Sequence, residues 1–354
     1  MSRFLDKRLL SLDAYVPGEQ PKRGAFIKLN TNEFPYPPAP GVPESVKNSV
    51  DDVNLYCDLT CKDLKTEFSK VFGYGGENVI FTNGSDEALY LCFLAFCGSE
   101  TGVAFADITY GFYTVYAELC GIDLLQIPLD FDFRIVPEDY YNLNRTIFIA
   151  NPNAPTGLSL SVSQVEAILK KNPDNVVVID EAYAAFSRVT CAELIEKYDN
   201  LVVVGTFSKS RGLAGARLGY IITNKELARD LETIKYSINP YNVNTLTQSA
   251  GTAVLRENDY YEKCISEIID TRDRFTKELI ELGFEVIPSK SNFVFAKNDK
   301  ISGMLLASKL REEGILIRRF DKERIKEYVR ISIGTPDQMV EVINKIKKIL
   351  GGIQ

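Results

Sequence analysis

The alternation of short apolar segments with helical segments between residues 60 and 240 most constrains the fold of this chain. Seven segments have the length and composition of buried strands, at 79–82, 102–106, 123–127, 146–150, 176–180, 201–205 and 217–222. Helical patterns occupy many of the intervals, at 60–72, 85–97, 111–120, 161–171 and 191–197. Strands that alternate with helices form mostly parallel sheets with covered faces. The sequence therefore predicts an α/β fold built on a mostly parallel, seven-stranded sheet covered by helices.

A different pattern after residue 240 predicts a second, smaller α/β unit. A long helix is expected over 259–282, followed by strands and helices at 284–287, 291–296, 301–313, 315–318, 328–333 and 336–350. The first 45 residues are rich in Pro, Gly and Asn, and their prolines exclude a long helix. We therefore expect an N-terminal arm over 1–45, a large domain over 46–240 and a small domain over 241–354. A dimer partner is one candidate for the surface that the arm covers.

The composition excludes several classes of function. The 354 residues include no histidine, which rules out Ser-His-Asp triads, Cys-His proteases and HExxH zinc sites. The net charge of −7 and the scattered basic residues argue against a nucleic-acid-binding surface. The seven cysteines have no C-x-x-C spacing, so we expect neither a disulfide framework nor a metal site. No apolar stretch reaches 18 residues, and we expect a cytoplasmic protein without a membrane segment.

Polar residues follow three of the predicted strands, at the edge where open parallel sheets bind ligands. These residues are Asn153, Asp180 and Lys209, and the lysine is preceded by Ser208 and followed eight residues later by Arg217. Pyridoxal phosphate requires a lysine amine that carries it and an acid that keeps its ring nitrogen protonated. Its phosphate requires hydroxyls and a guanidinium. The residues at this edge therefore favour a pyridoxal-phosphate site.

The segments around Asp180 and Lys209 resemble the fold-type I aminotransferases. The lysine segment of that family reads roughly S-K-x-x-G-L-A-G-x-R, and residues 208–217 read S-K-S-R-G-L-A-G-A-R. The family's acid segment, D-E-A-Y, matches residues 180–183. The resemblance implies that Lys209 carries pyridoxal 5'-phosphate, Asp180 pairs with the ring nitrogen and Tyr183 approaches the ring oxygen. The alternatives are an ordinary loop lysine and an acid that caps a helix.

Three further segments extend this resemblance to the cofactor's phosphate and ring. Ser85 suits a helix N-cap, and the free amides of such a turn favour a phosphate. The resemblance implies that six residues hold the phosphate: Gly84, Ser85, Asp86, Thr206, Ser208 and Arg217. It also implies that Tyr110 stacks on the ring. The family's N-N-P-T-G turn has Ala154 in place of its second asparagine here, so Asn153 is assigned to the ring oxygen.

Arg330 lies in an alternating strand of the predicted small domain, and a guanidinium matches a carboxylate bidentately. It resembles the family arginine that holds the α-carboxylate of the substrate. Residues 15–19 (Y-V-P-G-E), 29–33 (L-N-T-N-E) and 314–318 (G-I-L-I-R) resemble the N-terminal arm, the segment after it and the second arginine's strand of one subfamily, the histidinol-phosphate aminotransferases. That similarity implies that Tyr15, Asn32 and Arg318 bind substrate, and that Tyr56 reaches the partner subunit's cofactor phosphate in a homodimer.

Two residues depart from the subfamily's pattern, Cys57 and Arg211. The resemblance implies transamination of histidinol phosphate with 2-oxoglutarate, a reaction of histidine biosynthesis with an amino donor and a 2-oxo acid as small-molecule partners. Two alternatives are an amino-acid-phosphate decarboxylase similar to the threonine-phosphate decarboxylases and an aromatic aminotransferase. A non-catalytic sensor would need a DNA-binding appendage, for which the arm is too short and too rich in proline.

Overall fold

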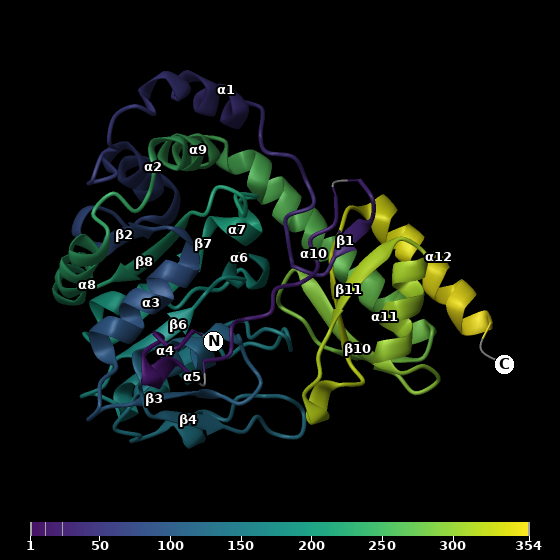
Figure 1. The fold of residues 1–354 in the computed structure, drawn as a ribbon. Coiled ribbons are helices and arrows are strands. Elements are labelled where there is room, and N and C mark those ends of the chain that lie inside the picture. Colours follow the sequence, from purple (N-terminus) through teal and green to yellow (C-terminus); the bar gives the residue numbers. More distant parts are fainter. Residues whose placement is uncertain (1, 11, 23, 353–354) are drawn as a thin grey trace.

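The computed structural model describes residues 2–10, 12–22 and 24–352, which build two separate sheets (Figure 1). The larger sheet has seven strands in the spatial order β2 (Val79–Thr82), β8 (Gly219–Thr223), β7 (Leu201–Thr206), β6 (Val177–Asp180), β5 (Thr146–Ala150), β3 (Val103–Ala106) and β4 (Leu124–Ile127). Neighbouring strands are parallel except at β8, which runs antiparallel to both β2 and β7. The predicted mostly parallel, seven-stranded sheet is confirmed.

Both faces of the larger sheet are apolar, because the central strands β5, β6 and β7 consist mainly of buried apolar residues. Val177 and Ile179 of β6 belong to one core cluster, and Val178 belongs to the other. The first cluster includes residues of α2 (Lys62–Phe72), α5 (Val162–Lys171) and α9 (Thr245–Arg256). The second includes residues of α3 (Gly84–Phe96), α4 (Phe112–Cys120) and α8 (Lys225–Ile238). Successive strand side chains point to opposite faces, so a run without polar residues requires helices on both.

The smaller sheet has five strands in the order β1 (Ile27–Leu29), β11 (Ile315–Arg319), β12 (Val329–Ser332), β10 (Phe293–Asn298) and β9 (Phe284–Ile287). Only the β1–β11 pair is parallel. Its core includes residues of α10 (Asn258–Glu281), α11 (Gly303–Glu312) and α12 (Pro336–Gly351). Figure 1 shows α10 running from the larger sheet to the smaller one. The predicted second α/β sheet is confirmed.

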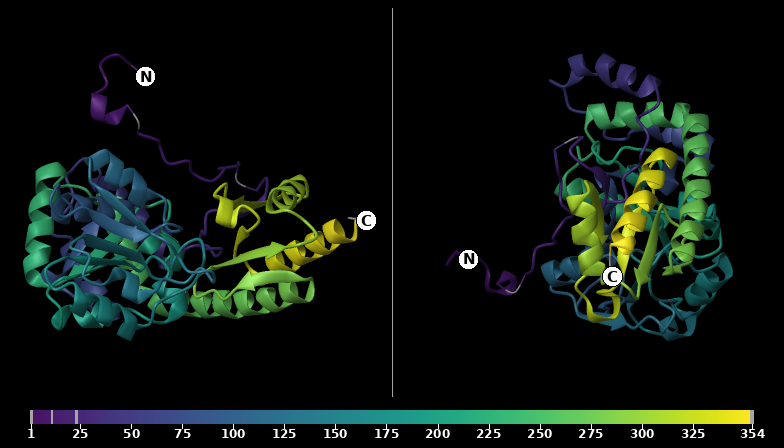
Figure 2. Two further views of the ribbon diagram at one scale, coloured as in Figure 1. Left: turned by 90° about the horizontal axis from the view of Figure 1, so that it is seen from below. Right: turned by 90° about the vertical axis from the view of Figure 1, so that its right-hand side faces the viewer.

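The N-terminal segment does more than lie over another surface. Its residues 27–29 form the edge strand β1 of the smaller sheet, paired with residues 315–317. It continues into α1 (Gly41–Asn48), which packs on α9 and has Pro43 in its first turn, where proline is tolerated. Residues 2–10 extend away from the rest of the molecule (Figure 2), whereas Tyr15 stacks on Phe112 and Glu19 pairs with Arg311.

Helices α8 and α9 were absent from the sequence prediction. The sequence of α9, Thr-Leu-Thr-Gln-Ser-Ala-Gly-Thr-Ala-Val-Leu-Arg, has little intrinsic helix propensity, and burial against α1 and α2 stabilises it instead. The predicted helix at 191–197 is the 3-10 helix η5 (Ala192–Glu196). The remaining short elements are η1 (Lys7–Leu9), η2 (Val50–Asp52), η3 (Gly76–Asn78), η4 (Pro137–Tyr140), α6 (Ala184–Ser187), α7 (Phe207–Ser210) and η6 (Glu323–Ile325). In the described part of the chain, no helix combines the length and apolar character that crossing a membrane requires.

Candidate active site

A cavity lies beyond the carboxyl ends of β5, β6 and β7, at the edge of the larger sheet where the sequence predicted a site. Nine of the predicted residues line it: Ser85, Asp86, Tyr110, Asp180, Tyr183, Thr206, Ser208, Lys209 and Arg217. They come from five separate segments of the chain. The parallel strands bring them together because their carboxyl ends meet at one edge.

Lys209 lies in α7, the single helical turn that begins where β7 ends. Thr206 caps this turn, since its hydroxyl accepts a hydrogen bond from the Ser208 amide at 3.1 Å. The Lys209 amine donates to the carbonyl oxygen of Thr31 at 3.1 Å and lies 6.0 Å from the centre of the Tyr183 ring. A residue of the N-terminal segment thus holds the lysine at the mouth of the cavity.

Asp180 ends β6 and is only 5% exposed. Its carboxylate accepts hydrogen bonds from the Tyr113 hydroxyl at 2.9 Å and from the Ala182 amide at 3.1 Å. Burial nevertheless raises the pKa of Asp180 to about 6, because desolvation outweighs these hydrogen bonds. A cation placed against this carboxylate would stabilise its charged form.

Arg217 and the amino end of α3 lie next to each other in the wall of the cavity. Arg217 forms an ion pair with Asp86 at 2.8 Å, and its second terminal nitrogen lies 3.4 Å from the Ser208 hydroxyl. The fit is close: a Cβ on Gly84, whose φ is +79°, would lie 2.5 Å from the guanidinium. Helix α3 begins at Gly84, so Ser85 lies in its first turn and not at the N-cap position expected from the sequence.

Tyr110 contributes an aromatic ring to the cavity and is held by its own hydroxyl. That hydroxyl donates to the second carboxylate oxygen of Asp86 at 2.8 Å. Asp86 therefore bridges Arg217 and Tyr110 and fixes both side chains relative to the start of α3.

The structure argues against the role expected for Asn153. Its amide nitrogen donates to the carbonyl oxygen of Ile108 at 2.9 Å and to the Thr156 hydroxyl at 3.2 Å, while its oxygen accepts from Thr109 at 2.7 Å. Ala154, and not Asn153, lines the Lys209 cavity. Both polar ends of the Asn153 amide are therefore engaged by protein groups in this structure.

The hydroxyl of Tyr183 accepts a hydrogen bond from the Asn32 side-chain nitrogen at 2.9 Å. Asn32 follows β1 and also contacts Ser332 of β12, with two further hydrogen bonds of 2.9 Å. Asn32 was expected to bind substrate, but its amide in this structure bonds Tyr183 and Ser332. It joins the small sheet to the cofactor side of the cavity.

Arg318 and Arg330 are opposite each other on the antiparallel strands β11 and β12. Arg330 donates to the carbonyl oxygen of Asn30 at 3.2 Å, and Arg318 donates to that of Val16 at 3.1 Å. Within residues 2–10, 12–22 and 24–352, no carboxylate pairs with either arginine. The Arg330 Nε atom is buried without a hydrogen-bond partner. Burial lowers the pKa of Arg330, and the charge of Arg318 lowers it further.

Two predicted residues lie apart from the Lys209 cavity in this single chain. Tyr15 stacks on Phe112, with ring centres 4.3 Å apart, and its ring centre lies 6.3 Å from that of Tyr110. Tyr56 is 81% exposed and stacks on Tyr241 at 4.1 Å. Neither lines the cavity.

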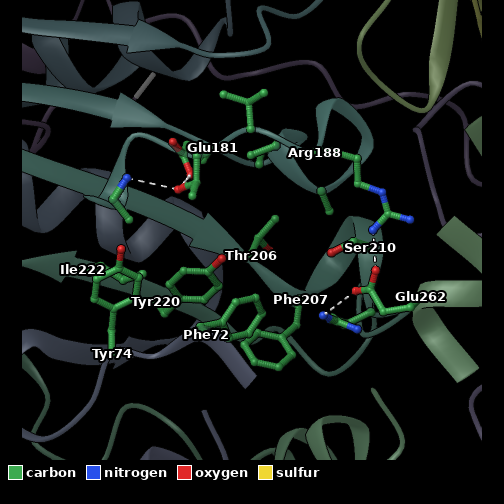
Figure 3. Close-up of a pocket in the computed structure, with 17 residues that line it drawn as sticks. Phe72, Tyr74, Glu181, Arg188, Thr206, Phe207, Ser210, Tyr220, Ile222 and Glu262 are labelled. Carbon is green, nitrogen blue, oxygen red and sulfur yellow. Dashed lines mark hydrogen bonds and ion pairs between the residues drawn. The ribbon is translucent and has the colours of Figure 1, made fainter. Parts of the chain in front are cut away.

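Arg211, which departs from the subfamily's pattern, lies beside a second cavity that shares Thr206 and Ala182 with the first (Figure 3). Its guanidinium is buried between the rings of Phe72 and Tyr261, at 5.5 and 5.8 Å from their centres. It pairs with Glu262 at 3.2 Å, and Glu262 also pairs with Arg188. These contacts join α7 to α10 and explain the arginine structurally.

Sequence reasoning missed three partners of the predicted residues. Tyr113 holds Asp180, Ser332 holds Asn32, and the Thr31 carbonyl holds Lys209. Tyr113 could have been found, because it lies in the first turn of α4, only three residues after the predicted Tyr110. The other two depend on contacts between residues more than 170 positions apart and left no local signal.

The chain is similar in sequence and in structure to known proteins. The family described as aminotransferase class I and II matches residues 25–346. A histidinol-phosphate aminotransferase from Brachyspira hyodysenteriae is 46% identical over 352 residues, covering 99% of each chain. The structure of such an enzyme from Sinorhizobium meliloti, in complex with pyridoxal-5'-phosphate, is similar with a TM-score of 0.90 at 23% identity, covering 100% of this chain and 99% of that one.

A Porphyromonas gingivalis L-threonine-O-3-phosphate decarboxylase has the same fold. Its structure matches with a TM-score of 0.80 at 24% identity and covers 92% of this chain and 99% of that one. The fold is therefore common to transaminating and decarboxylating proteins, and it does not by itself separate the two reactions.

Proposed function

Because the chain belongs to the class I and II aminotransferases, we propose that it transfers the amino group of histidinol phosphate to 2-oxoglutarate with pyridoxal 5'-phosphate as cofactor. The products are imidazole acetol phosphate and glutamate, in a step of histidine biosynthesis. The observation that carries this proposal is the assembly of Lys209, Asp180, Tyr183 and Arg217 in one cavity. The full-length similarity to histidinol-phosphate aminotransferases supports the choice of amino donor.

The residues of the cavity fit the cofactor. Asp180 is a buried carboxylate that forms no ion pair with a cation among the described residues, and the protonated ring nitrogen would supply one. The amino end of α3 offers free backbone amides, and Arg217 lies across it with Ser208 nearby. These groups would hold the phosphate, while Tyr110 supplies a ring against which the pyridine can stack.

When bound, the cofactor supplies an electron sink for the charge that develops at the substrate α-carbon. Lys209 would hold the cofactor through its amine, and the same amine would act as the base that moves a proton at that carbon. Asp180 keeps the ring nitrogen protonated through charge pairing. Tyr183 supplies the hydroxyl for the ring oxygen, since Ala154 cannot. The chain contains no histidine, so the lysine is the natural base.

Substrate binding is assigned to the two arginines of the small sheet. Glutamate has two carboxylates, whereas histidinol phosphate has a phosphate and no carboxylate. A pair of guanidiniums without internal carboxylate partners suits both in turn. We assign the α-carboxylate of glutamate to Arg330 and the phosphate of histidinol phosphate to Arg318 with Tyr15 from the partner subunit's arm. We assign Asn32 the role of holding the Tyr183 hydroxyl and not that of binding the substrate.

We also propose that the enzyme is a homodimer. Large apolar side chains between residues 50 and 56 are exposed: Val50, Val53, Leu55 and Tyr56. Exposed apolar patches of this kind mark protein interfaces. A partner subunit would cover them, and Tyr56 would then reach the partner subunit's cofactor phosphate. Sedimentation of the purified protein tests this, and a monomer at micromolar concentration would contradict it.

The enzyme assay should separate three reactions. Purified protein loaded with pyridoxal phosphate should convert histidinol phosphate and 2-oxoglutarate to glutamate without releasing carbon dioxide. Carbon dioxide release from threonine phosphate would instead indicate the decarboxylase alternative. Faster turnover of tyrosine or phenylalanine than of histidinol phosphate would indicate an aromatic aminotransferase.

A further inference from the structure

Three buried side chains form a continuous hydrogen-bonded chain from the small sheet to the Lys209 cavity. Ser332 of β12 and Asn32 are each 1% exposed, and Tyr183 is 9% exposed. Ser332 bonds Asn32, and Asn32 bonds Tyr183, with every donor–acceptor distance 2.9 Å. The residues lie 149 to 300 positions apart in sequence, so only the folded molecule brings them together.

The Ser332 hydroxyl has a single hydrogen, and this determines which atom donates in each hydrogen bond between Ser332, Asn32 and Tyr183. The backbone N–H of Asn32 donates to Ser332 Oγ. The one hydrogen of that hydroxyl then has Asn32 Oδ1 as its acceptor. With the oxygen of the amide facing Ser332, the nitrogen must face Tyr183 and donate to its hydroxyl. The reversed amide would leave the Ser332 hydrogen buried without an acceptor, which is costly.

The Tyr183 hydroxyl therefore accepts from Asn32 and has its own hydrogen free. The described part of the chain offers that hydrogen no acceptor, and Tyr183 lines the Lys209 cavity. Ala154 stands where related enzymes have an asparagine, so this hydroxyl is the donor that remains for a ring oxygen.

We propose that Ser332 is a positioning residue, which orients the Asn32 amide so that the Tyr183 hydroxyl donates into the Lys209 cavity. The proposal rests on the proposed function, because the acceptor in that cavity is the ring oxygen of pyridoxal phosphate. Arg330 and Ser332 are two residues apart on β12 and share one face of the strand. One strand thus carries both the candidate carboxylate anchor and the residue that orients the cofactor's tyrosine.

The test is a pH titration of the absorbance of the cofactor-loaded enzyme, which reports the pKa of the nitrogen that joins Lys209 to the cofactor. The ring oxygen and this nitrogen share one proton. A hydrogen bond donated to the ring oxygen makes that oxygen a weaker acceptor for the shared proton, and so lowers the pKa of the nitrogen. Ser332→Ala frees the Asn32 amide to turn, and Tyr183 can then donate to Asn32 Oδ1. We expect the pKa to rise by about one unit, a tenfold change in the equilibrium.

A double-mutant cycle separates positioning from general damage. Tyr183→Phe should raise the pKa at least as much as Ser332→Ala, and the double variant should rise no further than Tyr183→Phe alone. Ser332→Thr keeps the hydroxyl and should restore the parent titration. Ser291→Ala is the matched control, because Ser291 is fully buried and its hydroxyl has no partner. It should titrate as the parent does.

If Ser332→Ala does not fold, Asn32→Asp replaces the donor with an acceptor and should give the same rise, again absent in a Tyr183→Phe background. A parent-like titration of the variant, or shifts that add in the double variant, would overturn the proposal. The proposed function fails separately: a parent protein that shows no cofactor band, or carries the cofactor on another lysine, contradicts that function before any variant is made.

Discussion

The charged groups that we assign to the cofactor differ from those that we assign to the substrate in how they find partners. On the larger-sheet side, Asp180 accepts from Tyr113, Arg217 pairs with Asp86, and Lys209 donates to a main-chain carbonyl. On the small-sheet side, Arg318 and Arg330 are opposite each other, and among the described residues their hydrogen bonds go to main-chain carbonyls.

This difference matches the two kinds of ligand that we propose. A resident cofactor is served best by groups that are oriented in advance, and internal hydrogen bonds provide that orientation. Exchanging anionic substrates are served by positive charge left without an internal carboxylate, because a buried charge favours any anion that reaches it. The groups assigned to the cofactor are therefore oriented in advance, whereas the arginines assigned to the substrate keep their charge available for anions that bind and leave.

The largest expected effect is on the cofactor side, at Lys209. Lys209→Ala should lower turnover by more than about 10²–10⁴-fold, the range for loss of a general base alone, since the variant also loses the cofactor's attachment. Borohydride treatment of the parent should attach the cofactor to the peptide that contains Lys209, and the variant should not be labelled there. Lys197→Ala serves as the control, because it removes an exposed lysine. Label on another lysine of the parent would break the assignment.

Asp180→Asn should lower the rate of α-proton removal by roughly 10²–10³-fold, the range for loss of one oriented electrostatic partner. The substitution keeps the shape and removes the charge, so cofactor binding should persist. Glu181→Gln is the matched control, because Glu181 is buried next to Asp180 but its carboxylate bonds Thr190 and Cys191 instead. Single-turnover kinetics with the loaded enzyme measure both variants. Near-parent rates for Asp180→Asn would show that this side lacks the charge pairing that we assign to it.

Arg330→Ala tests the small-sheet side. It should weaken transition-state stabilisation with glutamate by about 2–5 kcal/mol, because a charge-assisted pair in a desolvated site is lost. The loss with histidinol phosphate should be smaller, since Arg318 and Tyr15 share its phosphate. Separate kinetics of the two half-reactions measure this difference. Arg319→Ala removes a neighbouring arginine that already pairs with Asp321, and it should affect neither half-reaction. Equal losses for both substrates would mean that this side does not discriminate as proposed.

The contribution of Asp180 to the stability of the cofactor-free protein should decrease as pH rises from about 4 to 6. Burial raises the pKa of Asp180 from 3.8 to about 6, so the folded state binds this proton more tightly than the unfolded state does. Stability is then highest below the unfolded pKa and declines up to the folded one, by at most about 3 kcal/mol for this group. Denaturant unfolding of the parent and of Asp180→Asn across this range isolates the contribution. A constant difference between the two proteins would contradict it.

The smallest effect is expected for Tyr113→Phe, which removes one hydrogen bond to Asp180. Such a bond contributes about 1 kcal/mol, so turnover should fall only several-fold. The pKa of Asp180 in the cofactor-free protein should rise further, because this hydrogen bond lowers it. Tyr140→Phe is the matched control, since Tyr140 is equally buried but its hydroxyl has no partner. Changes of the same size in both variants would point to packing instead of hydrogen bonding.

The same two sides differ in how far the sequence could describe them. Lys209, Asp180 and the start of α3 each follow a strand that is apolar along its length, so local pattern placed them at one edge of the sheet. The partner of Asn32 could not be found in this way, because Ser332 lies 300 residues away. The hydrogen bonds of the Asn153 amide could not be found either, because a motif reports residue types but not which way an amide points.

The fold shows the same limit. Most predicted strands agree with the structure to within two residues at each end. Short runs rich in β-branched residues favour buried strands, so the local sequence is enough to locate them. Strand β1 and helix α9 were missed, because packing against distant elements stabilises them more than their own sequences do.

The pairing of β1 with β11 also determines when this enzyme can become active during its own synthesis. Residues 27–29 leave the ribosome early but cannot pair until residues 315–317 have followed them. Closing so long a loop carries a large entropic cost and slows folding. The segment just after β1 supplies the Thr31 carbonyl that holds Lys209 and the amide that holds Tyr183. The larger sheet can thus assemble while the chain is still growing, but its catalytic groups reach their final positions only when the last strands of the small sheet are in place.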